Sequence, residues 1–119
     1  MRGRVISFSE KQGYGFITGE NGLDYFVHFS KIMDESKHLD VNEIVEFEPI
    51  KTDKGSEALN VTPILTFEMV KKKAEKKKMQ LIETLDPPKH GWVLVDKNNF
   101  IKGSENGMFL DEINKYLED

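Results

Sequence analysis

Residues 12–18 read QGYGFIT and, after a short polar turn, residues 24–29 read DYFVHF. Both segments are rich in aromatic and β-branched residues, and turn formers separate them, which is typical of two strands joined by a hairpin. Side chains alternate between the two faces of a strand. If the two strands pair, four flat side chains form one contiguous platform: Tyr14, Phe16, Phe26 and His28.

Three further segments of similar composition extend this pattern. The five expected strands cover residues 5–8, 14–18, 23–29, 44–50 and 58–65. Turn-forming residues bound each segment, and no helical periodicity lies between them. Five short strands within about 65 residues predict a mostly β fold, a small antiparallel barrel that removes exposed strand edges by closing on itself.

The platform has two interpretations, because aromatic residues of small domains usually belong to the core. Seven of the twelve aromatic residues lie in residues 1–65, which is more than so small a barrel can bury. Gly13 and Gly15 add little bulk, so the strand can lie close to a ligand. Nucleic-acid bases cover exposed rings by stacking, which contributes roughly 1–3 kcal/mol for each base. The sequence therefore favours a surface that binds single strands.

The same segments resemble the cold-shock domain family. Residues 3–5 and 13–17 are similar to its first RNA-binding signature, residues 24–30 resemble its second, and residues 54–61 resemble its turn into the last strand. The resemblance covers residues 1–65 and implies a five-stranded OB-type barrel that binds single-stranded RNA or DNA. Carried over position by position, it implies that the aromatic binding residues are Phe8, Tyr14, Phe16, Phe26, His28 and Phe29.

The chain departs from the family pattern near the first strand. Ile6 and Ser7 stand where the family commonly has lysine and then tryptophan, and Gln12 replaces a common lysine. One stacking ring and two phosphate-facing charges are therefore absent. We expect these changes to weaken binding or to shift its sequence preference.

Charge is unevenly distributed along the chain. There are 17 basic and 21 acidic residues, a net charge of −4, so no overall positive charge indicates a nucleic-acid binder. Residues 66–85 are rich in lysine, whereas the segments before and after them are acidic, and this asymmetry predicts separate structural parts: 1–65, 66–86 and 87–119. The expected phosphate contacts are Arg2, Arg4, Lys11, Lys31 and Lys54.

The remaining parts are expected to be helix, then hairpin and helix. Apolar residues spaced three and four apart predict a helix over residues 67–85, ended by Asp86 and two prolines. It is either a solvated connecting helix or a basic arm that follows phosphates. Residues 87–119 predict a small ββα unit, too small to bury a core alone. It must pack on the barrel, on the helix or on a second copy, and we expect a homodimer through residues 87–119.

Several classes of chemistry lack support in the sequence. There is no cysteine, and the spacing of His28, His38 and His90 does not suit a metal. No phosphate-binding loop or nucleophile elbow is present. We therefore expect no catalysis, cofactor, metal or small-molecule substrate. Apolar runs fall short of the roughly 20 residues that span a bilayer, and residues 1–8 do not read as a signal peptide, so we expect a cytoplasmic protein without a membrane partner.

Two functions of different classes follow from this reading. The first is a single-stranded RNA- or DNA-binding protein that stacks bases on its aromatic face and acts as an RNA chaperone or as a regulator of transcription or later steps. The alternative is a protein–protein interaction or dimerisation module in which the OB barrel is only a scaffold.

Overall fold

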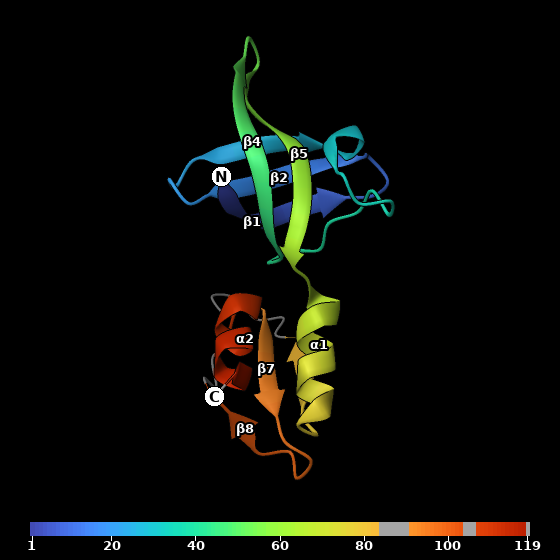
Figure 1. The fold of residues 1–119 in the computed structure, drawn as a ribbon, viewed down its shortest axis with the longest axis vertical. Coiled ribbons are helices and arrows are strands. Elements are labelled where there is room, and N and C mark those ends of the chain that lie inside the picture. Colours follow the sequence, from blue (N-terminus) through green and yellow to red (C-terminus); the bar gives the residue numbers. More distant parts are fainter. Residues whose placement is uncertain (84–90, 104–106, 119) are drawn as a thin grey trace. The chain divides into compact units, whose positions relative to one another are not determined.

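The computed structural model describes residues 1–83, 91–103 and 107–118. The chain forms two compact units, residues 1–64 and residues 65–119 (Figure 1). All five strands expected in the first unit are present, with ends that differ by a few residues. They are β1 (Arg2–Ser9), β2 (Tyr14–Gly19), β3 (Asp24–His28), β4 (Ile44–Thr52) and β5 (Gly55–Leu65), with a short 3₁₀ helix η1 (Phe29–Lys31) after β3.

The five strands form a closed barrel in the order β1-β2-β3-β5-β4. Closure comes from β1, which pairs with β2 on one side and with β4 on the other. Figure 1 shows β4 and β5 crossing β1 and β2 at a steep angle. The barrel is not antiparallel throughout, because β3 and β5 pair in parallel where Phe26 meets Glu57. The barrel core consists of Val5, Ile17, Tyr25, Val27, Ile32, Leu39, Val45, Phe47, Ala58 and Val61.

The contact between β1 and β2 depends on a glycine. A Cβ atom at Gly15 would lie 2.0 Å from the carbonyl oxygen of Ser7 and 2.7 Å from the Cα of Phe8. The pairing of the two strands also shifts between Val5 and Ser7, so β1 carries a bulge at Ile6. A bulge bends its strand and changes the direction of the side chains that follow it. The close approach at Gly15 therefore holds the bulged part of β1 against β2.

The second unit contains two helices and a three-stranded sheet. Its elements are α1 (Phe67–Lys76), β6 (Gln80–Glu83), β7 (Trp92–Val95), β8 (Ile101–Lys102) and α2 (Leu110–Glu118), with the strands in the order β6-β7-β8. Val70 and Ala74 of α1 are buried with Leu94 of β7 and with Ile113 and Leu117 of α2. The Trp92 ring stacks on Phe67, with 5.4 Å between the ring centroids. This unit therefore has a core of its own.

The structure corrects the helix expected over residues 67–85. That helix ends at Lys76, and Lys78 then adopts a left-handed conformation, with a φ of 60°, which turns the chain into β6. Leu81, which matched the helical spacing, lies opposite Leu94 in the β6–β7 pair instead. A few apolar residues at this spacing fit a helix and a strand equally well. Hydrogen bonding to β7 selects the strand. Residues 84–90, where the helix was expected to end, lie outside the described residues.

The three expected parts are therefore two in the structure. Residues 66–83 do not form a connecting helix, because both α1 and β6 belong to the second unit. The expected hairpin and final helix are present as β7, β8 and α2, and α1 supplies the apolar surface that they need. The burial of Ile113 and Leu117 thus requires no second copy of the chain. Among the described helices, none is long and apolar enough to cross a membrane.

We expect Gly15→Ala to lower the free energy of unfolding of the first unit by about 1–3 kcal/mol or more, because the added Cβ collides with the β1 backbone. Urea unfolding followed by far-UV circular dichroism measures the loss. Gly22→Ala is the control, since nothing lies within 4 Å of the added Cβ and the strain comes only from its φ of 83°, a positive φ that Gly15 does not share. The control should lower the free energy of unfolding by only about 1 kcal/mol. Equal losses for the two variants would contradict the close approach at Gly15.

Candidate nucleic-acid interface

The four rings expected on one platform do lie together on the outer face of β2 and β3. Tyr14 is paired with His28 and Phe16 with Phe26 across the two strands. The ring centroids of Tyr14 and Phe26 are 5.4 Å apart, and those of Phe16 and Phe26 are 5.8 Å apart. We call the surface made by Tyr14, Phe16, Phe26 and His28 the aromatic platform. Its rings come from alternate positions of two adjacent strands, as side-chain alternation requires.

Burial separates the platform from the core. Tyr14 and Phe16 are 36% and 39% exposed, whereas their inward-facing neighbour Ile17 is completely buried. On β3, Val27 is completely buried and Tyr25 is 5% exposed, whereas Phe26 between them is only half-buried. The barrel thus fills its interior with one set of side chains and leaves the other set of rings in contact with solvent. The interpretation of Tyr14 and Phe16 as core residues is excluded.

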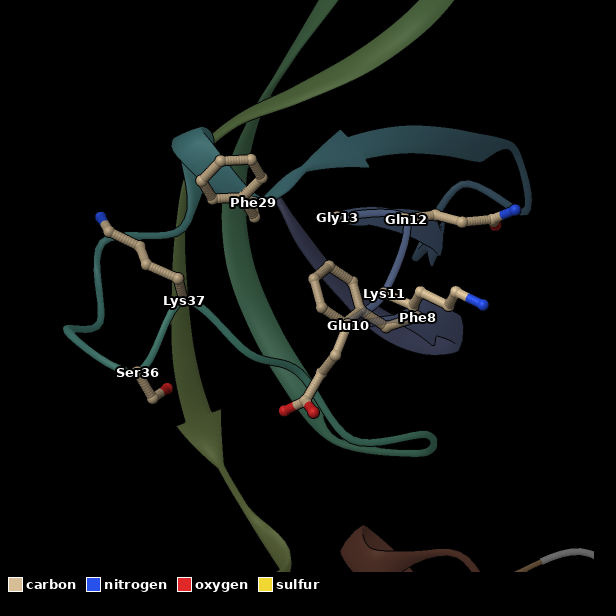
Figure 2. Close-up of a pocket in the computed structure, with 8 residues that line it drawn as sticks. All are labelled: Phe8, Glu10, Lys11, Gln12, Gly13, Phe29, Ser36 and Lys37. Carbon is tan, nitrogen blue, oxygen red and sulfur yellow. The ribbon is translucent and has the colours of Figure 1, made fainter.

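Phe8 and Phe29 do not belong to the platform; they border a separate cleft. Its volume is about 350 Å³, and Figure 2 shows its eight lining residues. Phe8 faces away from the platform because the β1 bulge places it opposite Gly15 rather than opposite a platform ring. Phe29 packs over Gly13, where an added Cβ would lie 2.8 Å from the ring. The remaining residues of the cleft are Glu10, Lys11, Gln12, Ser36 and Lys37.

His28 connects the platform to the cleft. Its ring centroid lies 4.5 Å from that of Phe29. The backbone N–H of Ser30 donates a hydrogen bond to its Nδ1 at 3.2 Å. An Nδ1 that accepts a hydrogen bond carries the lone pair, so the proton of the neutral ring is on Nε2. The structure therefore holds the His28 ring in one orientation with a donor group left over for a ligand.

His38 is a member of the cleft region that the sequence did not indicate. Its ring meets Phe8 edge-on, with 5.7 Å between the centroids. Its Nδ1 lies 2.8 Å from Oε1 of Glu10, and its Nε2 lies 2.6 Å from Oδ1 of Asp40. In the sequence, His38 stands in a loop without periodicity and was considered only as a metal ligand. Among the described residues, no group of three or more His, Asp or Glu side chains is placed to hold a metal ion.

The expected phosphate contacts lie in the loops and at the strand ends around these rings. Lys11 lines the cleft beside Phe8. Lys31 ends the short helix η1 that begins at Phe29, and it is exposed. Lys54 is exposed in the turn between β4 and β5, three residues before Glu57, whose backbone pairs with Phe26. These cations come from three segments far apart in the sequence.

Two acidic residues of the first unit lie beside the platform and others lie away from it. Glu57 of β5 is paired with Phe26. Glu46 and Glu48 are exposed on β4, which is separated from β2 by β1. On β2 and β3, the carboxylate beside the rings is that of Asp24, which accepts a hydrogen bond from the hydroxyl of Thr18 at 2.7 Å. Arg2 and Arg4 lie on the neighbouring β1. The platform therefore has Asp24 and Glu57 beside it and two arginines on the adjoining strand.

Comparison with known proteins gives a consistent result for the first unit. The family model described as 'Cold-shock' DNA-binding domain matches residues 1–64. The chain is similar to Cold shock protein 1 of Lactiplantibacillus plantarum, with 48% identity over 62 residues, which are 51% of this chain and 94% of that protein. It is also similar to Cold shock protein CspB of Geobacillus stearothermophilus, with 42% identity over 64 residues, 53% of this chain and 97% of that protein.

Among solved structures, drosophila Unr CSD456 is similar at 21% identity with a TM-score of 0.45, covering 82% of this chain and 43% of that one. A likeness of this size does not define a fold or a function. The two bacterial relatives match the first unit along nearly their whole length. Each of them thus corresponds to the barrel of this chain without its second unit.

Proposed function

The chain belongs to the cold-shock domain family, and we propose that it binds single-stranded RNA or DNA by stacking bases on the aromatic platform. The observation that carries this proposal is the exposure of Tyr14 and Phe16 on a strand whose alternate residues are buried. Exposed rings leave favourable burial unused, and bases are flat, apolar on their faces and able to cover them. The description of the matching family model as a DNA-binding domain supports the same chemistry.

The geometry favours a strand that runs over several rings in succession. The Phe26 ring lies 5.4 Å from the Tyr14 ring and 5.8 Å from the Phe16 ring, and His28 lies 4.5 Å from Phe29 at the cleft. Stacking reads the face of a base rather than its edge, so affinity depends little on sequence. Lys11 at the cleft would meet the phosphate backbone there. We expect binding without strong sequence preference.

Such binding suits a protein that keeps RNA single-stranded. A protein that covers the faces of bases competes with their stacking and pairing in a folded RNA, and weak sequence preference lets it act on many RNAs. We therefore propose a role as an RNA chaperone or as a regulator of transcription or of later steps. The proposal does not call for catalysis or a cofactor.

Phe16→Ala and Phe26→Ala should each weaken binding of a short oligothymidine by roughly 1–3 kcal/mol, because each removes a stacking surface. Fluorescence anisotropy at low salt measures the affinity, and circular dichroism confirms that each variant is folded. Phe100→Ala is the matched control, since it removes an exposed ring from the second unit. Unchanged affinity in folded Phe16→Ala and Phe26→Ala proteins would contradict the platform as the binding surface.

The salt dependence of binding tests which lysines contact phosphates. On single strands, log K falls against log[salt] with a slope of about −0.7 for each phosphate contact. Lys11→Gln should make the slope of the full chain shallower by about 0.7. Lys76→Gln in α1 should leave it unchanged, because we expect the lysines of α1 to be solvated. A change with Lys76→Gln instead would show that α1 follows the nucleic-acid strand.

A homodimer through the second unit is the second candidate function, and one observation favours it. The register of β6, β7 and β8 places Ile82 beside Val93, and Val95 beside Ile101, on the sheet face opposite Leu94. Ile82 and Ile101 are exposed there. An exposed apolar sheet face can pair with an identical face about a twofold axis. Val93, Val95 and Ile101 lie within residues 87–119, where the dimer was expected, whereas Ile82 lies outside them.

If this face forms a dimer, sedimentation equilibrium of the full chain should give about twice the monomer mass. Ile82→Lys should return the mass to that of a monomer, because it would place charges in the apolar contact. Lys72→Glu on the exposed side of α1 is the control and should leave the mass unchanged. A wild-type protein that sediments as a monomer at high concentration would contradict the dimer.

A further inference from the structure

A second hollow lies on the first unit beside the aromatic platform. Its volume is about 420 Å³. We call it the arginine hollow; its lining is Arg2, Gly3, Arg4, Ile6, Thr18, Gly19, Glu20 and Ile44. These residues come from β1, from the end of β2 and the turn that follows it, and from the first residue of β4. The proposed function makes no use of this hollow.

The β1 bulge joins the hollow to the platform. Ser7 is paired with Phe16, whose ring is 39% exposed. Ile6, the extra residue of the bulge, is 43% exposed and lines the hollow. Ile44 lies on the next strand, where it is paired with Arg4. Ile6 thus directly precedes the residue paired with Phe16, and Ile6 and Ile44 are the aliphatic side chains of the lining.

The polar rim of the hollow is mainly cationic. Arg2 and Arg4 both line it, and two guanidinium groups form a favourable environment for a phosphate. Glu20 is the one acidic residue of the lining, and one of its carboxylate oxygens lies 3.5 Å from the backbone nitrogen of Arg2. Apolar floor and basic rim together match a nucleotide, which has an apolar base face and an anionic phosphate.

We propose that the arginine hollow binds one further nucleotide of the strand that lies on the platform, with the base on Ile6 and Ile44 and its phosphate facing Arg2 and Arg4. This inference rests on the proposed function. Adjacency to the platform favours this occupant over a free anion, because Ile6 directly precedes Ser7, the residue paired with Phe16.

Oligothymidines of increasing length, from about three to nine nucleotides, test the hollow with the full chain. Wild-type affinity should rise with length until the hollow is filled. In Ile6→Ser and in Arg2→Gln, the final increase in affinity with length should be lost. Long oligonucleotides should then bind about three- to tenfold more weakly than to the wild type, and short ones should bind equally well. Circular dichroism verifies that the variants are folded.

Two substitutions outside the hollow are the matched controls. Val41→Ser removes an apolar side chain that is 47% exposed, and Lys51→Gln removes an exposed positive charge from β4. Both should follow the wild-type length dependence. If Ile6→Ser and Arg2→Gln also follow it, the hollow is not a nucleotide site although the platform is. If the wild type binds no oligonucleotide of any length, the proposed function itself fails.

Discussion

The antiparallel pairing of Phe16 with Phe26 is the constraint on which the first unit depends. In a strand, the residues before and after a buried side chain point to the opposite face, so this one register sends Ile17 and Val27 into the core and the four platform rings to the surface. A shift of one residue would exchange the two sets. The rings would then enter an interior that also holds Val5, Val45 and Phe47 from the other strands, and the platform would disappear.

The same sheet shows how an acidic protein can present a surface suited to a polyanion. The charge of the whole chain is −4, but the side chains that decide binding are those within reach of the strand. Glu46 and Glu48 lie on β4, beyond β1, whereas β1 itself carries Arg2 and Arg4. In the binding mode that we propose, stacking on the rings carries most of the affinity and electrostatics contributes less.

The second unit shows a different solution to the problem of a small core. A hairpin and one helix have too little apolar surface to be stable, and α1 with β6 completes them. Val70 and Ala74 contribute one side of that core, and the stacking of Phe67 on Trp92 joins the beginning of α1 to β7. The lysines of α1 therefore lie on the exposed side of an amphipathic helix. Within the unit, Nζ of Lys73 donates a hydrogen bond to Oδ1 of Asn114 in α2 at 2.6 Å. The lysine-rich composition of residues 66–85 thus reflects a helix whose opposite side packs into the core of the second unit.

The sequence by itself determined the features that depend on local alternation. The five strands of the first unit and the common face of Tyr14, Phe16, Phe26 and His28 follow from a period of two, which any paired strand obeys. Only the tertiary structure decided the rest. Phe8 leaves the platform because a bulge at Ile6 interrupts the period, and His38 reaches Phe8 through a loop whose path no periodicity describes. Residues 80–83 became a strand because pairing with β7 outweighs a weak helical spacing. Local pattern specifies which face a side chain occupies, whereas bulges, loops and strand partners are selected by the free energy of the whole packed unit.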